Sequence, residues 1–235
     1  MQKNILITGA SRGLGLGLVT AYLEKGARVF ACARKQNSSY YAELKTRFGD
    51  NLQLVEMDVS CSASVNQAAA SIREMTGSLD ILINNAGIHA EDSFLPIEEV
   101  NVDNCIEVYN VNTLGPLRVT KELLPLLEKG NTKVLANISS EAGSITNCRR
   151  EKEFDYCMSK AALNMQSVIL QNYLKAKGIK VLSIHPGWFR SDMGGPNAHL
   201  AVSEAAEGVM NAIANFGGSL DNSVYLDTTG KIIAY

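Results

Sequence analysis

The segment that decides the fold lies at residues 4–15 and reads NILITGASRGLG. Its apolar start predicts a buried strand, and a helical pattern begins directly after the strand's glycine-rich end. Gly9 permits a tight turn, Gly13 lets the backbone approach a pyrophosphate, and Gly15 permits close contact between helix and sheet. The helix N-terminus offers free N–H groups to phosphates. The spacing G-x-x-x-G-x-G therefore predicts a nucleotide-binding loop, with a purely structural turn as the alternative.

Six further β-rich runs alternate with helical segments along the rest of the chain. Several of these runs are apolar on both faces, as expected of parallel strands that are covered on two sides. The order predicts one doubly wound, Rossmann-type α/β domain over residues 1–235, with a mostly parallel seven-stranded sheet flanked by helices. In addition to residues 4–8, the predicted strands are 27–33, 51–57, 79–83, 133–138, 180–185 and 223–227.

The composition excludes several classes of protein. A net charge of −2 and the lack of a long basic run give no reason to expect a nucleic-acid partner. The five cysteines are odd in number and never fall at C-x-x-C spacing, which argues against a disulfide framework and a zinc site. The N-terminal apolar run is too short for a signal sequence, and no window is long enough for a membrane helix. We therefore expect a soluble, cytoplasmic protein without a metal site or a membrane partner.

Polar residues and glycines follow six of the predicted strands within a few positions. Ligands of doubly wound sheets bind beyond the carboxyl ends of the strands, where such residues gather. The sequence therefore predicts one site that is assembled from six loops, at Gly9, Arg34, Asp58, Asn85, Ser140 and Pro186-Gly187.

The residue after the second strand indicates which dinucleotide binds. Arg34 stands 19 residues after Gly15, where an NAD site usually has an acidic residue. A guanidinium suits a 2′-phosphate, which an acid would repel. Arg12 could flank the same phosphate from the glycine loop. The two arginines favour NADP(H), unless both are ordinary solvated surface residues.

Tyr156 and Lys160 lie four residues apart in a segment with a helical pattern, so they share one helix face. The pKa of a phenol is near 10, and a lysine ammonium within about 4–6 Å can lower it by roughly 1–3 units. That change would suit Tyr156 to general acid–base catalysis. Alone, the pattern Y-x-x-x-K also fits an ordinary pair on a helix surface.

Taken together, these motifs closely resemble the short-chain dehydrogenase/reductase family over essentially the whole chain. Within it, HPGWFRSDMGGPNA and VYLDTTGKIIAY resemble the carbonyl-reductase branch related to the sniffer and C-factor proteins. The motifs that support the family resemblance are TGASRGLG, Asp58-Val59, Asn84-Asn85-Ala86-Gly87, Asn112, Ser139-Ser140, Tyr156-x-x-x-Lys160 and Pro186-Gly187.

The resemblance implies that NADPH reduces a ketone or aldehyde to an alcohol, and it gives each catalytic residue a role. Tyr156 would protonate the carbonyl oxygen, and Ser140 would hydrogen-bond that oxygen. Lys160 would lower the pKa of Tyr156 and hold the nicotinamide ribose. Asn112 would anchor a water that links Lys160 to solvent.

The resemblance also implies the cofactor contacts. Asp58 and Val59 would flank the adenine, residues 85–87 would pass behind the cofactor, and residues 186–191 would orient the nicotinamide carboxamide. The full set is Gly9, Ser11, Arg12, Gly13, Leu14, Gly15, Arg34, Asp58, Val59, Asn85, Ala86, Gly87, Tyr156, Lys160, Pro186, Gly187, Trp188, Phe189 and Ser191.

Two features depart from the family pattern. Ser191 stands where a threonine is usual, which keeps the hydroxyl. The interval between Ser140 and Tyr156 is longer than in many members, and it holds the charged run 149–153. We interpret that run as a solvated loop, with a charged lip that selects anionic substrates as the alternative. His89 is expected to be structural, while Trp188 and Met193 could line the substrate site.

Two other functions stay open at this point. One is a cofactor-sensing or signalling protein, and the other is a sugar-nucleotide epimerase or dehydratase, which shares Y-x-x-x-K. The expected partner is a small carbonyl compound. Members of the family often pair through the helices that hold Asn112 and Tyr156, so a homodimer or homotetramer is also expected.

Overall fold

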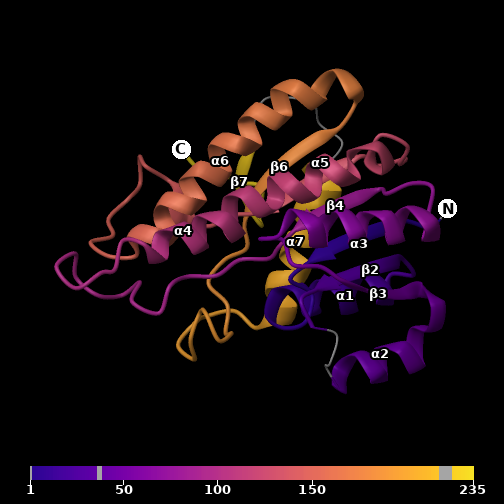
Figure 1. Ribbon diagram of the computed structural model, residues 1–235, viewed down its shortest axis with the longest axis horizontal. Coiled ribbons are helices and arrows are strands. Elements are labelled where there is room, and N and C mark those ends of the chain that lie inside the picture. Colours follow the sequence, from indigo (N-terminus) through magenta and orange to yellow (C-terminus); the bar gives the residue numbers. More distant parts are fainter. Residues whose placement is uncertain (1, 36–38, 217–223) are drawn as a thin grey trace.

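A computed structural model describes residues 2–35, 39–216 and 224–235. At its centre is a seven-stranded sheet in the order β3-β2-β1-β4-β5-β6-β7 (Figure 1), in which every neighbouring pair is parallel. The strands are β1 (Asn4–Thr8), β2 (Arg28–Ala33), β3 (Leu52–Glu56), β4 (Ile81–Asn84), β5 (Val134–Ile138), β6 (Lys180–His185) and β7 (Tyr225–Asp227).

The predicted Rossmann-type sheet is confirmed, and it is parallel throughout rather than mostly parallel. Two predicted strands, 4–8 and 180–185, have the observed bounds, and the others differ by one or two residues at one or both ends. The last predicted strand began at Ser223, which lies outside the described residues.

Seven helices connect the strands within the described ranges. Between α4 and α5 the helix continues as a π-helical turn, η2 (Asn110–Leu114), and a short turn, η3 (Glu141–Gly143), follows β5. The helices are α1 (Gly13–Glu24), α2 (Ser39–Phe48), α3 (Ser62–Met75), α4 (Asn104–Tyr109), α5 (Gly115–Leu127), α6 (Phe154–Leu174) and α7 (Val202–Phe216).

The sheet is covered on both faces because its side chains alternate between two apolar cores. In β1, Ile5 and Ile7 pack in the core that includes buried residues of α1, α2 and α7. Leu6 points to the opposite face, where buried residues of α3 and α5 pack. Burial on both faces explains why the strand reads as a continuous apolar run.

The order of the strands reverses at β1, and this reversal positions the site. From β1 the chain proceeds outward to β2 and β3, and it then returns to β4 on the other side of β1. The loops after β1 and β4 therefore leave the sheet in opposite directions and open a crevice beyond their carboxyl ends. Among the helices of the described ranges, none is long and apolar enough to cross a membrane.

Candidate active site

A cavity of about 1220 Å³ lies at the carboxyl edge of the sheet. It is lined by every predicted catalytic and cofactor residue except Asn112. Lining residues that had no predicted role include Lys35, Met57, Ile88, Phe94, Glu141, Asp192, Gly194 and Val202. The six predicted loops thus meet at one site, together with parts of longer loops that the motifs did not mark.

The glycine loop is tightly packed on one side and open on the other. A side chain at Gly15 would place its Cβ 2.2 Å from the Gly9 carbonyl oxygen, and one at Gly9 would lie 2.7 Å from Ala86 Cα. Gly13 has a φ of +52°, and a Cβ there would meet nothing within 4 Å. The start of α1 therefore presents bare backbone to the cavity, which is the form of a phosphate cradle.

Asn85 fixes the width of the crevice between the loops after β1 and β4. Its Nδ2 donates to the carbonyl oxygens of Thr8 at 2.8 Å and Gly9 at 3.2 Å. The backbone N–H groups of Asn85 and Ala86 both donate to Thr8 Oγ1, at 3.0 and 3.1 Å. The Asn85 side chain thus supports the glycine loop, and the predicted passage of residues 85–87 behind the cofactor stays a prediction.

The loops after β2 and β3 form the basic end of the cavity. Arg34 and Lys35 are exposed and line it. Asp58 accepts hydrogen bonds from Ser60 N at 2.9 Å and Ser60 Oγ at 2.6 Å. The Ser60 hydroxyl bond lowers the pKa of Asp58 most, and the charge of Arg34 lowers it further. This end can hold an adenosine whose 2′-phosphate faces Arg34 and Lys35.

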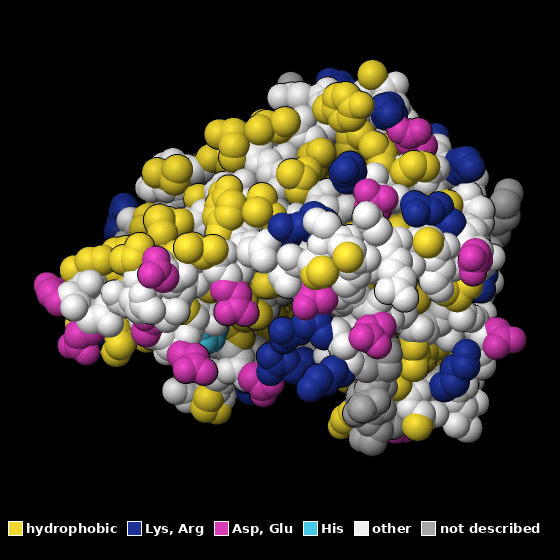
Figure 2. All heavy atoms as spheres, in the orientation of Figure 1, with side chains coloured by type: hydrophobic (Ala, Val, Ile, Leu, Met, Phe, Trp, Pro, Cys, Tyr) yellow, Lys and Arg dark blue, Asp and Glu magenta, His cyan; other side chains and the backbone are white. Residues whose placement is uncertain are grey.

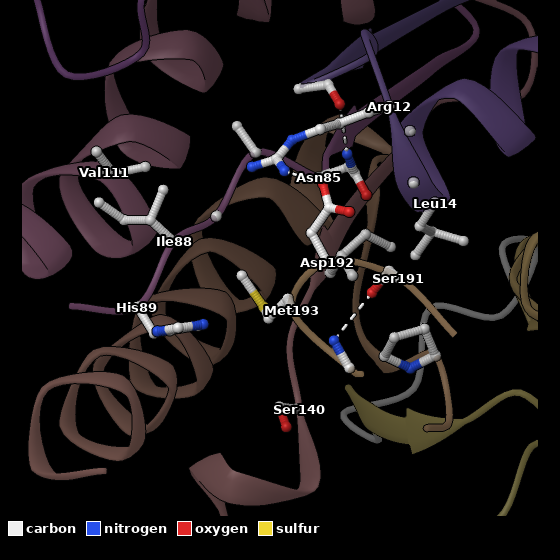
Figure 3. A pocket seen from close by; sticks show the side chains of 18 of the residues that line it. Arg12, Leu14, Asn85, Ile88, His89, Val111, Ser140, Ser191, Asp192 and Met193 are labelled. Carbon is white, nitrogen blue, oxygen red and sulfur yellow. Dashed lines mark hydrogen bonds and ion pairs between the residues drawn. The ribbon is translucent and has the colours of Figure 1, made fainter. Parts of the chain in front are cut away.

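Arg12 differs from its predicted position. Its guanidinium forms an ion pair with Asp192, from the loop between β6 and α7, so the pair joins two loops that line the cavity (Figure 3). Both side chains are exposed. Arg12 would have to leave Asp192 to join Arg34 at a 2′-phosphate, so the predicted convergence of the two arginines is not seen in this structure.

Ser140 and Tyr156 meet on the other side of the cavity. Ser140 precedes η3, and its Oγ accepts a hydrogen bond from Ala142 N at 3.2 Å. Tyr156, from the first turn of α6, lines the same cavity as Ser140. Burial raises the pKa of Tyr156 to about 12, although the Ser140 hydroxyl acts to lower it. Tyr156 therefore carries its proton at neutral pH.

Lys160 lies deeper than Tyr156 and is almost fully buried. Its Nζ donates to the Ile138 carbonyl oxygen at 2.8 Å and lies 5.5 Å from the centroid of the Tyr156 ring. Burial lowers the pKa of Lys160 to about 8. The predicted lowering of the phenol pKa is wrong for this structure, because desolvation of Tyr156 outweighs every charge near it.

Asn112 lies behind the cavity in the π-helical turn and is fully buried. Its Oδ1 accepts from Ile88 N at 2.8 Å, while its Nδ2 donates to Ile88 O at 2.8 Å and Ser159 Oγ at 3.0 Å. A Cβ on Gly87 would lie 3.4 Å from Asn112 Oδ1 and 3.7 Å from Lys160 Nζ. The Asn112 side chain thus joins the loop after β4 to α6, and its role in proton supply stays a prediction.

The loop after β6 bends sharply at the cavity. Gly187 has a φ of +84°, and the Trp188 Nε1 donates to the Gly194 carbonyl oxygen at 2.8 Å. Ser191 Oγ accepts from Gly194 N at 3.0 Å, so this hydroxyl closes the turn. His185, at the end of β6, accepts from Glu141 N through Nδ1 at 3.2 Å. This imidazole therefore supports the Ser140 loop.

The charged run 149–153 is only partly the solvated loop that we expected. Arg150 Nη2 donates to Glu141 Oε1 at 2.5 Å, and Arg150 Nη1 pairs with Glu153. All three side chains line the cavity, whereas Glu151 and Lys152 are exposed. The signals in the sequence for this cluster were the unusual length of the interval between Ser140 and Tyr156 and the charged run that it holds.

Comparison with known proteins agrees with this geometry. A family model described as short chain dehydrogenase matches residues 3–199. An uncharacterised oxidoreductase of Schizosaccharomyces pombe is 35% identical over 208 residues, which cover 88% of this chain and 79% of the relative. The C-signal protein of Myxococcus xanthus is 36% identical over 138 residues, which cover 59% of this chain and 82% of that protein.

Two solved structures are similar over the whole chain. The NADPH-bound carbonyl reductase from chicken fatty liver has a TM-score of 0.89 at 32% identity, and the match covers 100% of this chain and 99% of that one. The carbonyl reductase Sniffer of D. melanogaster has a TM-score of 0.91 at 29% identity, with both chains covered completely.

Proposed function

Because the chain belongs to the short-chain dehydrogenase family and to its sniffer-related, carbonyl-reductase-like branch, we propose that it reduces a ketone or aldehyde with NADPH. The observation that supports this most directly is that Ser140, Tyr156 and Lys160 line the same cavity as the glycine loop and Arg34. We take residues 1–235 as one domain that serves this reaction.

The residues on the cofactor side fit an NADP(H) molecule. The bare backbone at Gly13 and the start of α1 would hold the pyrophosphate, and Arg34 with Lys35 would hold the 2′-phosphate. When bound, NADPH supplies the hydride. Two similar structures, from chicken fatty liver and Burkholderia multivorans, hold NADPH and NADP, respectively.

Side chains of the protein would donate the proton and stabilise the charges that form during the reduction. Tyr156 keeps its proton up to about pH 12, so it can donate that proton to the substrate oxygen as charge develops there. Ser140 would donate a hydrogen bond to the same oxygen. The Lys160 ammonium, 5.5 Å from the ring centroid, would stabilise the phenolate that remains. Each residue thus acts on charge that appears during the reaction.

We propose that the protein forms a homodimer through α4 and α6. Apolar side chains gather on one part of the surface over these helices (Figure 2). Six of them are more than 40% exposed: Ile106, Tyr109, Met158, Met165, Ile169 and Tyr173. An apolar surface of this kind is typical of protein–protein contacts. Sedimentation equilibrium of the wild type and of Ile169→Glu would test the dimer.

The experiment that tests the function is NADPH oxidation, followed by absorbance, with a panel of ketones, aldehydes, quinones and ketoacyl thioesters. We expect turnover of at least one class. If NADPH binds but no member of the panel is reduced, the reductase proposal is wrong. The cofactor-sensing alternative, which the similarity to C-signal also suggests, would then be preferred.

A further inference from the structure

The part of the cavity beside Ser140 has an apolar wall whose residues take no part in the proposed chemistry. His89, Phe94, Trp188 and Met193 all line the cavity, and His89 and Met193 lie around the same space as Ser140 in Figure 3. The His89 and Phe94 rings pack edge to face with centroids 5.4 Å apart. Phe94 and Trp188 are each about half exposed, at 52% and 49%. Large apolar side chains left exposed inside a cavity indicate an apolar ligand.

This wall is fixed to the start of α6, next to Tyr156. The Asp155 carboxylate is buried, and it accepts hydrogen bonds from Ala90 N at 2.8 Å and Ser93 Oγ at 2.6 Å. The Glu153 N–H donates to the Ser93 carbonyl oxygen at 2.8 Å. The segment that holds His89 and Phe94 is therefore attached to the residues on both sides of Phe154. A ligand on the wall would lie close to the tyrosine and to the Glu153 carboxylate.

A charged cluster of Glu141, Arg150 and Glu153 stands on the same side of the cavity. Arg150 bonds to one glutamate through each Nη, so the cluster holds one positive and two negative charges. Its side chains are 50%, 33% and 16% exposed, respectively. Lys160 also lines the cavity, but it is only 4% exposed and bonds to the Ile138 carbonyl oxygen. A substrate that enters therefore meets the two carboxylates before it meets that ammonium.

The backbone at Glu153 gives a second reason to assign its side chain a function. Its φ of +62° and ψ of +40° lie in the left-handed region, which costs energy for any residue with a Cβ. Glycine or asparagine would adopt this conformation at lower cost. A glutamate here, paired with Arg150 in a cavity, suggests that the carboxylate itself is required.

We propose that the cavity selects uncharged, apolar carbonyl compounds, and that Glu141 and Glu153 reject substrates with a carboxylate near the carbonyl group. The Arg150 guanidinium is engaged by both glutamates, so it does not serve as an anion-binding group. This inference rests on the proposed reductase function, and it reverses the earlier alternative of a lip that selects anions.

Two aldehydes of the same shape test the proposal, methyl 4-formylbenzoate and 4-formylbenzoate, which differ in one negative charge. We expect the wild type to favour the ester in kcat/KM by at least about tenfold. Two charges separated by several ångströms near a protein surface interact by about 1.4 kcal/mol or more, which corresponds to about tenfold or more. The double variant Glu141→Gln, Glu153→Gln should lower that preference by about tenfold, because each amide keeps the shape of the side chain it replaces.

Two further variants test whether the preference for the ester depends on the charges of this cluster or on any charge in the same loop. Glu151→Gln removes the same charge from the same loop at an exposed position, and the ester preference should not change. Arg150→Ala leaves the two carboxylates uncompensated, so the preference for the ester should increase. If the wild type prefers the acid and Arg150→Ala abolishes that preference, Arg150 binds anions and the proposal is overturned.

Binding of non-reducible analogues gives a readout that does not depend on turnover. Calorimetry on the NADPH-loaded protein should show tighter binding of methyl benzoate than of benzoate, with the difference reduced in the double variant. If this difference appears while neither aldehyde is reduced, the selectivity holds and the reductase proposal fails. Equal binding and equal turnover of the charged and uncharged compounds would overturn the selectivity alone.

Discussion

The cofactor half of the cavity is fixed by contacts between the short loops at neighbouring strand ends, whereas the substrate half is fixed by contacts between long loops. In the first half, Gly15 packs so closely on Gly9 that no Cβ fits, and Asn85 bonds to two backbone carbonyl groups. In the second half, Asp155 holds Ser93, and Arg150 holds Glu141. The difference explains how one fold can keep its cofactor while its substrate side varies.

The largest effect on activity should come from substitution of Tyr156, which lies where the two halves of the cavity meet. Tyr156→Phe removes the proton donor but keeps the ring against which Lys160 packs. We expect kcat for carbonyl reduction to fall by about 10³-fold, within the range for loss of a general acid. The dissociation constant for NADPH, measured by fluorescence titration, should change little. Substantial turnover by the variant would show that another group protonates the substrate.

The pH profile tests whether Lys160 acts as an ammonium. Burial lowers its pKa to about 8, so the positive charge is present below that pH and is lost as the pH rises through it. Without the charge, the phenolate that forms at Tyr156 is less stable, and kcat should fall by up to about tenfold per pH unit above pH 8. Lys160→Arg stays charged, because the pKa of arginine is above about 12. Its profile should stay flat in that range, and an inflection at the same pH would assign the titration to another group.

Arg34→Asp would change the charge of the cofactor half of the cavity and leave the substrate half as it is. Charge-assisted hydrogen bonds contribute about 1.5–3 kcal/mol, so KM for NADPH should rise by roughly ten- to a hundredfold, and KM for NADH should change far less. Lys129→Asp provides the matched control, since Lys129 is exposed between α5 and β5 and undergoes the same change of charge. Initial rates with both cofactors give the two constants. An equal rise in both would show that Arg34 does not distinguish the 2′-phosphate.

The contrast between the two halves of the cavity also explains which parts of the fold and of the site can be predicted from the sequence. The strands and the residues after them are predictable, because apolar alternation and glycine spacing are local and the sheet brings strand ends together. The charged cluster around Arg150 is not predictable in this way. Asp155 adjoins Tyr156 in sequence, yet it bonds to Ser93, 62 positions earlier. The spacing of Tyr156 and Lys160 likewise places them on one helix face, but it does not show that Lys160 bonds to the Ile138 carbonyl oxygen.

The smallest effect should come from the ion pair that joins the two halves of the cavity. Arg12 and Asp192 have side chains that are 71% and 77% exposed, and exposed pairs contribute at most about 1 kcal/mol. Asp192→Asn would release Arg12 toward a bound phosphate, so the affinity for NADPH should rise by about two- to fivefold. Asp192→Glu keeps the charge and should show no gain. Trp188, the single tryptophan of the chain, lines the cavity and gives a fluorescence signal for the titration. A weaker affinity in Asp192→Asn would mean that the pair orders the loop after β6 for the cofactor, so that the substrate half helps to build the cofactor half.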